Sequence, residues 1–282
     1  MRSRRSSYLF VSSLAALVCC SSTASATYVD EVLADNPIAY WRFEESIGSG
    51  GSLDSSVNSH SGAIGSGVTL GQPSVNGSLG NAASFNGGAN GKIDYGDGFA
   101  NFSSDDSYTL EAWINSNDLF GLHEIVSRHN DEAGTVNWEL RTDGPSAEFA
   151  LDLAFNFSTA ATAQSVSFNT GQWYHVVGVG TGSATGTNMQ IYVNGLVDGT
   201  GGFPTGPQSG DPDANVLVGA IEWTANRKFS GLIDEVAIYN TALSPERIKA
   251  HYDAVVPEPS ALVLATLALL SFGVTRRRRR RS

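Results

Sequence analysis

Short runs of β-branched and aromatic residues recur along the chain, and clusters of glycine, serine, asparagine and aspartate separate them every 8 to 15 residues. This punctuation predicts many short strands rather than long helices and is typical of an antiparallel β-sandwich. The predicted strands cover residues 38–44, 82–85, 107–114, 124–128, 136–141, 147–155, 173–179, 189–193, 216–221 and 231–239. Together they fit one domain over residues 27–256, because about 230 residues are enough to bury a full core.

Local signals refine this pattern. The alternation around Leu110 predicts one buried face and one wetter face, with Trp113 on the wetter side in need of a cover. Asn194-Gly195 lies between two strand-like runs and predicts a type I′ hairpin turn. Only two short helices are expected, one at Tyr28–Ala34 and one over residues 244–252 with Ser244 as N-cap and proline at its first position.

Cysteine and charge exclude several classes of function. Both cysteines, Cys19 and Cys20, precede residue 27, so the domain has no disulfide framework, no cysteine-ligated zinc and no thiol nucleophile. Residues 27–256 hold 8 basic and 27 acidic side chains, a net charge of −19. A surface this acidic repels phosphate backbones, so we expect no nucleic-acid partner.

The two ends of the chain predict export. Residues 1–26 have a basic start, an apolar run and Ala24-Ser25-Ala26, which together predict a signal peptide cleaved after Ala26. At the other end, residues 257–282 contain the tripeptide Pro257, Glu258 and Pro259, then fourteen uncharged residues at 261–274, then six arginines. We expect this apolar stretch to form a hydrophobic helix, with the arginines on the cytoplasmic side.

This C-terminal arrangement resembles the PEP-CTERM sorting tail of bacterial envelope proteins. The resemblance implies recognition by an exosortase in the inner membrane, with processing near the tripeptide. It predicts a protein at the cell envelope or surface, or in the extracellular matrix of a bacterium. The protein would be held in the inner membrane by its C-terminal segment, transiently or permanently. A plain C-terminal membrane anchor gives the same topology without cleavage.

A second resemblance covers residues 28–253. Six segments resemble, in order, those of LamG-like domains of the concanavalin A-like lectin/glucanase group: residues 39–45, 83–87, 108–114, 173–177, 191–195 and 229–240. The resemblance implies an all-β fold, a two-sheet antiparallel jelly-roll β-sandwich. That fold agrees with the strands predicted from the residues themselves.

The same resemblance suggests a structural calcium ion at the rim of the sheets. Its expected ligands are Glu44 (or Glu45), Asp54, Asn58 and Asp234, whose oxygen atoms suit Ca²⁺. The competing interpretation is that Asp234 pairs with an arginine or caps a turn.

Aromatic residues are the candidates for ligand binding, because flat rings stack on the apolar faces of sugars. Trp138 and Trp223 are the main candidates, with Phe155 and Phe157 beside them. Most aromatic residues of a sandwich nevertheless lie in its core. His175, within an aromatic strand, is expected to be a packed core residue.

Catalysis is not expected. Glucanases of this group carry the strand motif E-x-D-x-x-E, which is absent here. Two pairs of acids spaced four apart, Glu139 with Asp143 and Glu148 with Asp152, lack the third acid. Asp234 and Glu235 are adjacent and are expected to point to opposite faces of their strand.

The sequence therefore predicts an exported, non-catalytic surface or matrix protein that binds glycans or another envelope partner, such as a surface protein. The first alternative is a structural biofilm or matrix component without a specific ligand. The second is a glucanase-like glycoside hydrolase.

Overall fold

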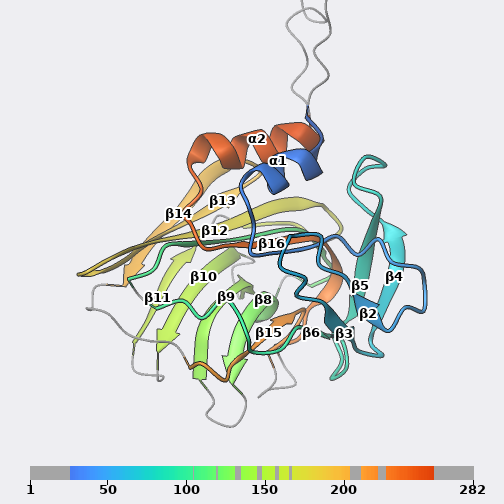
Figure 1. The fold of residues 1–282 in the computed structure, drawn as a ribbon, viewed down its shortest axis with the longest axis horizontal. Coiled ribbons are helices and arrows are strands. Elements are labelled where there is room, and N and C mark those ends of the chain that lie inside the picture. The colour runs from blue at the N-terminus through green and yellow to red at the C-terminus, as the bar shows by residue number, and fades with distance from the viewer. Residues whose placement is uncertain are drawn as a thin grey trace, which may run out of the picture.

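The computed structural model describes residues 26–256 except 104, 119, 131–134, 145–147, 156–158, 165–166, 204–210 and 222–226. The fold is the predicted all-β sandwich of two antiparallel sheets, with one short helix at each end of the described chain (Figure 1). The predicted signal peptide, apart from Ala26, and the predicted C-terminal hydrophobic helix lie outside the described residues. Neither helix that the structure describes is long and apolar enough to cross a membrane.

Each sheet contains eight strands. Sheet A has the order β14 (Leu196–Phe203), β13 (Gly186–Val193), β12 (Tyr174–Ser183), β7 (Tyr108–Ser116), β16 (Ser230–Tyr239), β5 (Asn81–Asn86) and β4 (Val68–Pro73), and β1 (Ala39–Trp41) also pairs with β16. Sheet B has the order β11 (Thr159–Gln164), β10 (Glu148–Phe155), β9 (Thr135–Asp143), β8 (His123–Asn130), β15 (Asn215–Val218), β6 (Ile93–Asp94), β3 (Gly62–Ile64) and β2 (Gly51–Ser52).

The predicted strands are all present with shifted ends, and six strands were missed. The missed strands β2, β3, β4, β6, β11 and β14 are short or rich in glycine and small polar residues, so they carry little hydrophobic alternation. β1 ends at Trp41, before the predicted end at residue 44, and two residues later Phe43 adopts a φ of +53°. The Asn194-Gly195 turn is confirmed, since both residues have the positive φ values of a type I′ turn.

The two faces of sheet A explain the alternation in β7. Leu110, Ala112 and Ile114 lie in the core between the sheets. Glu111 and Trp113 face the other way, yet both are buried, so the face that the sequence predicted to be wetter is dry. The reason is a helical cover over the outer face of sheet A.

Helices α1 (Tyr28–Ala34) and α2 (Pro245–Val255) form this cover, which we call the clasp (Figure 1). Thr27 caps α1 in a capping box with Asp30, and Ser244 caps α2 as predicted. Apolar residues of both helices pack on sheet A, and Tyr252 stacks on Trp113 at 5.9 Å between ring centroids. The clasp therefore joins the first and last described segments on one side of the sandwich.

A buried carboxylate fastens the clasp to the sheet. Glu111 accepts hydrogen bonds from the hydroxyl groups of Tyr28 (2.9 Å) and Tyr239 (2.8 Å). Its oxygens also lie 2.7 Å from His175 Nε2 and 3.0 Å from His251 Nδ1. The prediction that His175 is a packed core residue is thus confirmed. One side chain of β7 consequently holds both helices and two neighbouring strands.

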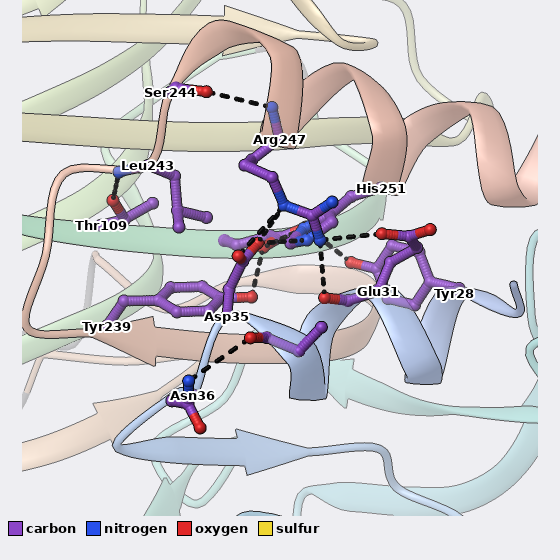
Figure 2. A network of polar contacts seen from close by, with 12 residues as sticks. Tyr28, Glu31, Asp35, Asn36, Thr109, Tyr239, Leu243, Ser244, Arg247 and His251 are labelled. Carbon is purple, nitrogen blue, oxygen red and sulfur yellow. Dashed lines mark hydrogen bonds and ion pairs between the residues drawn. The ribbon is translucent and has the colours of Figure 1, made fainter.

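The network continues outward along the interface of the two helices (Figure 2). His251 Nε2 lies 3.0 Å from Asp35 Oδ2, and Arg247 Nε lies 2.9 Å from the same oxygen. Arg247 Nη2 also contacts a Glu31 carboxylate oxygen at 2.8 Å. Both ring nitrogens of His251 face carboxylates, so a doubly protonated imidazolium fits this position.

The charges of the network stabilise one another. Burial alone would raise the pKa of Glu111, but His251 and the hydrogen bonds from both histidines lower it to well below its usual value. Burial would lower the pKa of His251, but the charge of Glu111 raises it above 6.5. The clasp is therefore locked by a buried ion pair.

Candidate functional site

A β-bulge in β16 places two buried acids on the outer face of sheet A. The pairing of β16 with β7 shifts register between Asp234 and Ala237, and Glu235 has a φ of +51°. Asp234 is opposite Trp113, and Glu235 accepts a hydrogen bond from the Tyr40 hydroxyl; both partners lie on the outer face of sheet A. The prediction that the two acids point to opposite faces is therefore wrong, because the bulge interrupts the alternation.

Few positive charges accompany these buried acids. Asp234 accepts hydrogen bonds from the Ser74 hydroxyl and from the Glu235 amide, while Arg42 Nε lies 3.4 Å from Glu235 Oε1. Burial raises the pKa of Glu235 to about 7. Burial, followed by the charge of Glu235, raises the pKa of Asp234 well above its usual value. Asp234 and Glu235 are thus two buried carboxyl groups whose charged forms are unfavourable.

Arg42, which contacts Glu235, also lines a pocket, and we call it the rim pocket. It measures about 180 Å³ and is lined by Arg42, Glu44, Glu45, Leu53 and Ser55. Glu45 Oε1 accepts a hydrogen bond from the Leu53 amide, whereas Glu45 Oε2 is buried without a partner. A buried acceptor without a donor is unfavourable, so one carboxylate of the pocket lining is incompletely satisfied.

The residues predicted to bind calcium have other roles in the structure. Asp54 accepts four hydrogen bonds that hold its loop, from the amides of Tyr40, Ser56 and His60 and from the Ser56 hydroxyl. Asn58 donates to the Ile38 carbonyl. An ion at Asp54 would have to displace these donors, because they already fill the lone pairs of the carboxylate.

The other two predicted ligands also have protein partners. Glu44 accepts hydrogen bonds from the amide and the side chain of Asn81, and Asp234 is engaged as described above. Within the described part of the chain, no three acidic or imidazole side chains are placed to hold one ion. The donor set therefore does not fit an ion at the four predicted positions together, and calcium binding stays a prediction.

Of the aromatic residues predicted to bind a ligand, only the Trp138 side chain is among those that the structure describes. Trp138 is fully buried between the sheets and donates from Nε1 to the Ala100 carbonyl at 2.9 Å. Its ring is part of the core, so it does not offer a face to a ligand, and that prediction is wrong for Trp138. Trp223 and Phe157 lie outside the described residues, and the Phe155 side chain is likewise not described.

A second polar cluster lies on the outer face of sheet B. Arg227 contacts Glu124 Oε1 through Nε at 2.6 Å and Glu139 Oε1 through Nη2 at 2.5 Å. Arg141 contacts Glu139 at 2.9 Å and Asp143 at 3.1 Å. We call these five residues the Arg227 cluster. The charges of Glu124 and Glu139 outweigh the effect of burial and raise the pKa of Arg227.

The strand register aligns two further acidic positions with this cluster. In the backbone pairing, Glu139 is opposite Asp152 and Asp143 is opposite Glu148, so the two sequence pairs lie on the neighbouring strands β9 and β10. Sequence reasoning listed these four acids but did not place them side by side. It also missed Glu124 and Arg227, since neither belongs to a local motif and the two residues lie far apart in the sequence.

Solved structures with the same fold include binding domains of bacterial toxins. The binding domain of Paraclostridial Mosquitocidal Protein 1 has a TM-score of 0.58 and 16% identity over 80% of this chain and 53% of that one. The botulinum neurotoxin serotype G binding domain has a TM-score of 0.55 and 17% identity over 77% of this chain and 50% of that one. The chain thus spans about half the length of these toxin structures.

A third similar structure is matched over nearly its whole length. Domain 4 of AbnA, a GH43 extracellular arabinanase from Geobacillus stearothermophilus solved in complex with arabinotriose, has a TM-score of 0.54 and 21% identity over 77% of this chain and 98% of that one. At these identities the likeness shows the fold alone. A search of curated proteins finds no match.

Two family profiles match the sequence. The C-terminal residues 255–280 match the PEP-CTERM protein-sorting motif, which implies export and sorting to the cell envelope. Residues 85–249, more than half of the chain, match the profile described as the concanavalin A-like lectin/glucanases superfamily. With its two-sheet sandwich and this match, the chain belongs to the concanavalin A-like lectin/glucanase superfamily.

Proposed function

We propose that this protein is an exported, non-catalytic module that binds a glycan at the rim pocket and is anchored at the cell envelope by its C-terminal segment. The observation that carries the proposal is the open rim pocket, whose lining includes the carboxylates of Glu44 and Glu45 as hydrogen-bond acceptors. Arg42 and Ser55 supply donors in the same pocket, and Leu53, which is 62% exposed, supplies an apolar surface. This combination suits the alternating hydroxyl and C–H groups of a sugar.

The size of the pocket limits the ligand. Its volume of about 180 Å³ is below the roughly 300–1,000 Å³ of pockets for drug-sized molecules. We infer that the pocket takes one sugar residue or the end of a glycan chain rather than a long stretch of polymer. Arabinotriose is the first ligand to test, because a domain of the same fold has been solved with it.

The test is a calorimetric titration of the full exported chain with arabinotriose and with β-glucan oligosaccharides. We expect at least one of them to bind, and the Glu45→Gln substitution to weaken that binding about tenfold, since a hydrogen bond to a charged group contributes about 1.5–3 kcal/mol. Glu246→Gln is the matched control, because it makes the same chemical change on α2, outside the rim pocket. Equal affinities of the wild type and Glu45→Gln would contradict the proposal, as would no binding of any of these oligosaccharides.

Calcium is tested in the same experiment. Repeating the titration and a thermal melt with a chelator and then with added Ca²⁺ tests whether the ion supports the rim. A melting temperature that does not change on chelation would count against structural calcium. It would not affect the conclusion about glycan binding.

Glycoside hydrolysis is the second candidate, and the Arg227 cluster favours it. Two nearly buried glutamates converge on one guanidinium there, and hydrolysis of a glycosidic bond uses two nearby carboxyl groups. One of the two must hold a proton as the general acid, however, whereas ion pairs with arginine stabilise the charged carboxylate. We therefore favour binding. Release of reducing sugar from arabinan or β-glucan, lost in Glu124→Gln or Glu139→Gln, would establish the hydrolase instead.

A further inference from the structure

The clasp lies next to the place where the chain meets the sorting motif. α2 ends at Val255, with Val256 as C-cap, and the apolar stretch of the tail begins at Ala261. Only Pro257, Glu258, Pro259 and Ser260 lie between the folded domain and this stretch. Figure 1 shows α1 and α2 together over sheet A, with sheet B on the far side.

We propose that this short connection holds the domain with the clasp toward the bilayer and the outer face of sheet B away from it. The proposal rests on the anchoring part of the proposed function and not on the glycan. It follows from a comparison of the length of the connection with the thickness of the molecule.

The connection is short on the scale of the domain. From Val256 to Ala261 the chain makes five Cα–Cα steps, which span at most about 18 Å when fully extended. The headgroup region takes up about 5–8 Å of that distance on each side of a bilayer. The end of α2 therefore stays within roughly 10–13 Å of the membrane surface while residues 261–274 are in the bilayer.

The opposite orientation does not fit this length. A helix is about 10 Å thick and two packed sheets lie about 10 Å apart, so the end of α2 lies roughly 20 Å from the outer face of sheet B. With sheet B on the membrane, the connection would have to span about 25 Å or more, which exceeds its reach. The inverted orientation is therefore excluded by covalent geometry.

Charge does not produce this orientation. The two helices carry Asp30, Glu31, Glu246 and Asp253 as well as Arg247 and Lys249 at exposed or partly buried positions, so the clasp is not a basic surface that anionic lipids attract. Exposed Leu33, Leu196 and Val256 are on the clasp or beside it and make close approach to a bilayer tolerable. The orientation should therefore depend on the length of the tether and be insensitive to salt.

The test uses single cysteines, since the sequence has none after Cys20. Ala34→Cys on α1 and Ala63→Cys on β3 are matched substitutions of exposed alanines, and Ala63 shares the outer face of sheet B with Asp94. The full exported chain of each variant is labelled with the same donor fluorophore. It is then reconstituted in phosphatidylethanolamine–phosphatidylglycerol vesicles that carry an energy acceptor on a headgroup. Val197→Cys, near the start of β14 and beside α2, is a second clasp-side position in case Ala34→Cys fails to fold.

We expect energy transfer from position 34 to exceed that from position 63 at least about twofold, because roughly 20 Å separates the two layers. The difference should persist in high salt. A twenty-residue Gly/Ser insertion between Val256 and Pro257 should largely remove it, since such a linker spans roughly 25 Å on average. Equal or reversed transfer in vesicle-bound, unextended chains would overturn the orientation. Failure of the chain to sediment with vesicles would overturn the anchoring and the orientation together, but would leave glycan binding intact.

Discussion

Replacement of Glu111 by glutamine should destabilise the whole domain through the clasp. Glu111 is fully buried and faces only donors, namely two tyrosine hydroxyls and two histidine rings. Glutamine keeps the shape but has one acceptor oxygen instead of two and brings an amide donor to a place where every neighbour also donates. It also leaves His251 without the charge that Glu111 supplied.

The size of the effect follows from this arrangement. A hydrogen bond to a charged group contributes about 1.5–3 kcal/mol, and the substitution removes about two of the four. Breaking a buried ion pair by removing one partner costs about 3–5 kcal/mol. Both routes give a loss of about 3–5 kcal/mol in the free energy of unfolding, which is a large share of the roughly 5–15 kcal/mol of an ordinary domain.

Urea denaturation followed by far-ultraviolet circular dichroism measures this loss. The midpoint should fall while the slope of the transition stays unchanged, because the surface exposed on unfolding is the same. Asp253→Asn is the control. It removes a surface pair with Lys249, which is 2.6 Å away, and should cost less than about 0.5 kcal/mol. A loss below about 1 kcal/mol for Glu111→Gln would refute the claim that this carboxylate locks the clasp.

The same network predicts how stability changes with pH. The pKa of Glu111 is lowered in the folded state, so its contribution is present above about 4.5 and is lost as the pH falls through the lowered value. The pKa of His251 is raised, so its contribution is fully present below 6.5 and is lost as the pH rises through the raised value. The network should thus contribute most between about pH 4.5 and 6.5, and Glu111→Gln should flatten this dependence.

Three further substitutions test the packing. Trp138→Ala should cost about 3–5 kcal/mol in urea denaturation and leave oligosaccharide affinity per folded molecule unchanged, since the ring is in the core. Gly219→Ala should lower the unfolding free energy by more than about 1 kcal/mol, because φ is +81° and the new Cβ would lie 2.3 Å from the Phe85 ring. Gly98→Ala is the control. Its Cβ would meet open space, so it should change the unfolding free energy by less than about 0.5 kcal/mol. Arg128→Lys should lower the melting temperature, because the guanidinium donates to four backbone carbonyls and one side chain in two loop segments, whereas an ammonium has only three donors.

The sequence correctly predicts those structural elements that depend on residues adjacent in the chain. Asn194-Gly195 has the conformational freedom that its hairpin turn needs, and Ser244 with Pro245 defines the start of α2. Strands with β-branched and aromatic residues were found for the same reason. The two short helices were expected, but nothing in their sequence indicates that they lie against each other.

The candidate sites depend on distant parts of the chain, so they could not be predicted in the same way. Glu111 contacts His175 and His251, which lie 64 and 140 residues further along the sequence. Arg227 likewise pairs with Glu124, which is distant in the sequence. The faces of Asp234 and Glu235 were predicted wrongly because one extra residue in β16 reverses the alternation on which the prediction depended. Trp138 was proposed to bind a ligand because the residue type alone does not say which face of a strand is covered.

Hydrogen–deuterium exchange of the full exported chain, with and without a saturating oligosaccharide that it binds, tests the central claim most directly. The account predicts slower exchange at residues 42–55 around the rim pocket, unchanged exchange in β8 and β9, and an oligosaccharide whose mass stays intact. Slower exchange in β8 and β9 together with shortened oligosaccharide would contradict the account and identify the Arg227 cluster as a catalytic site.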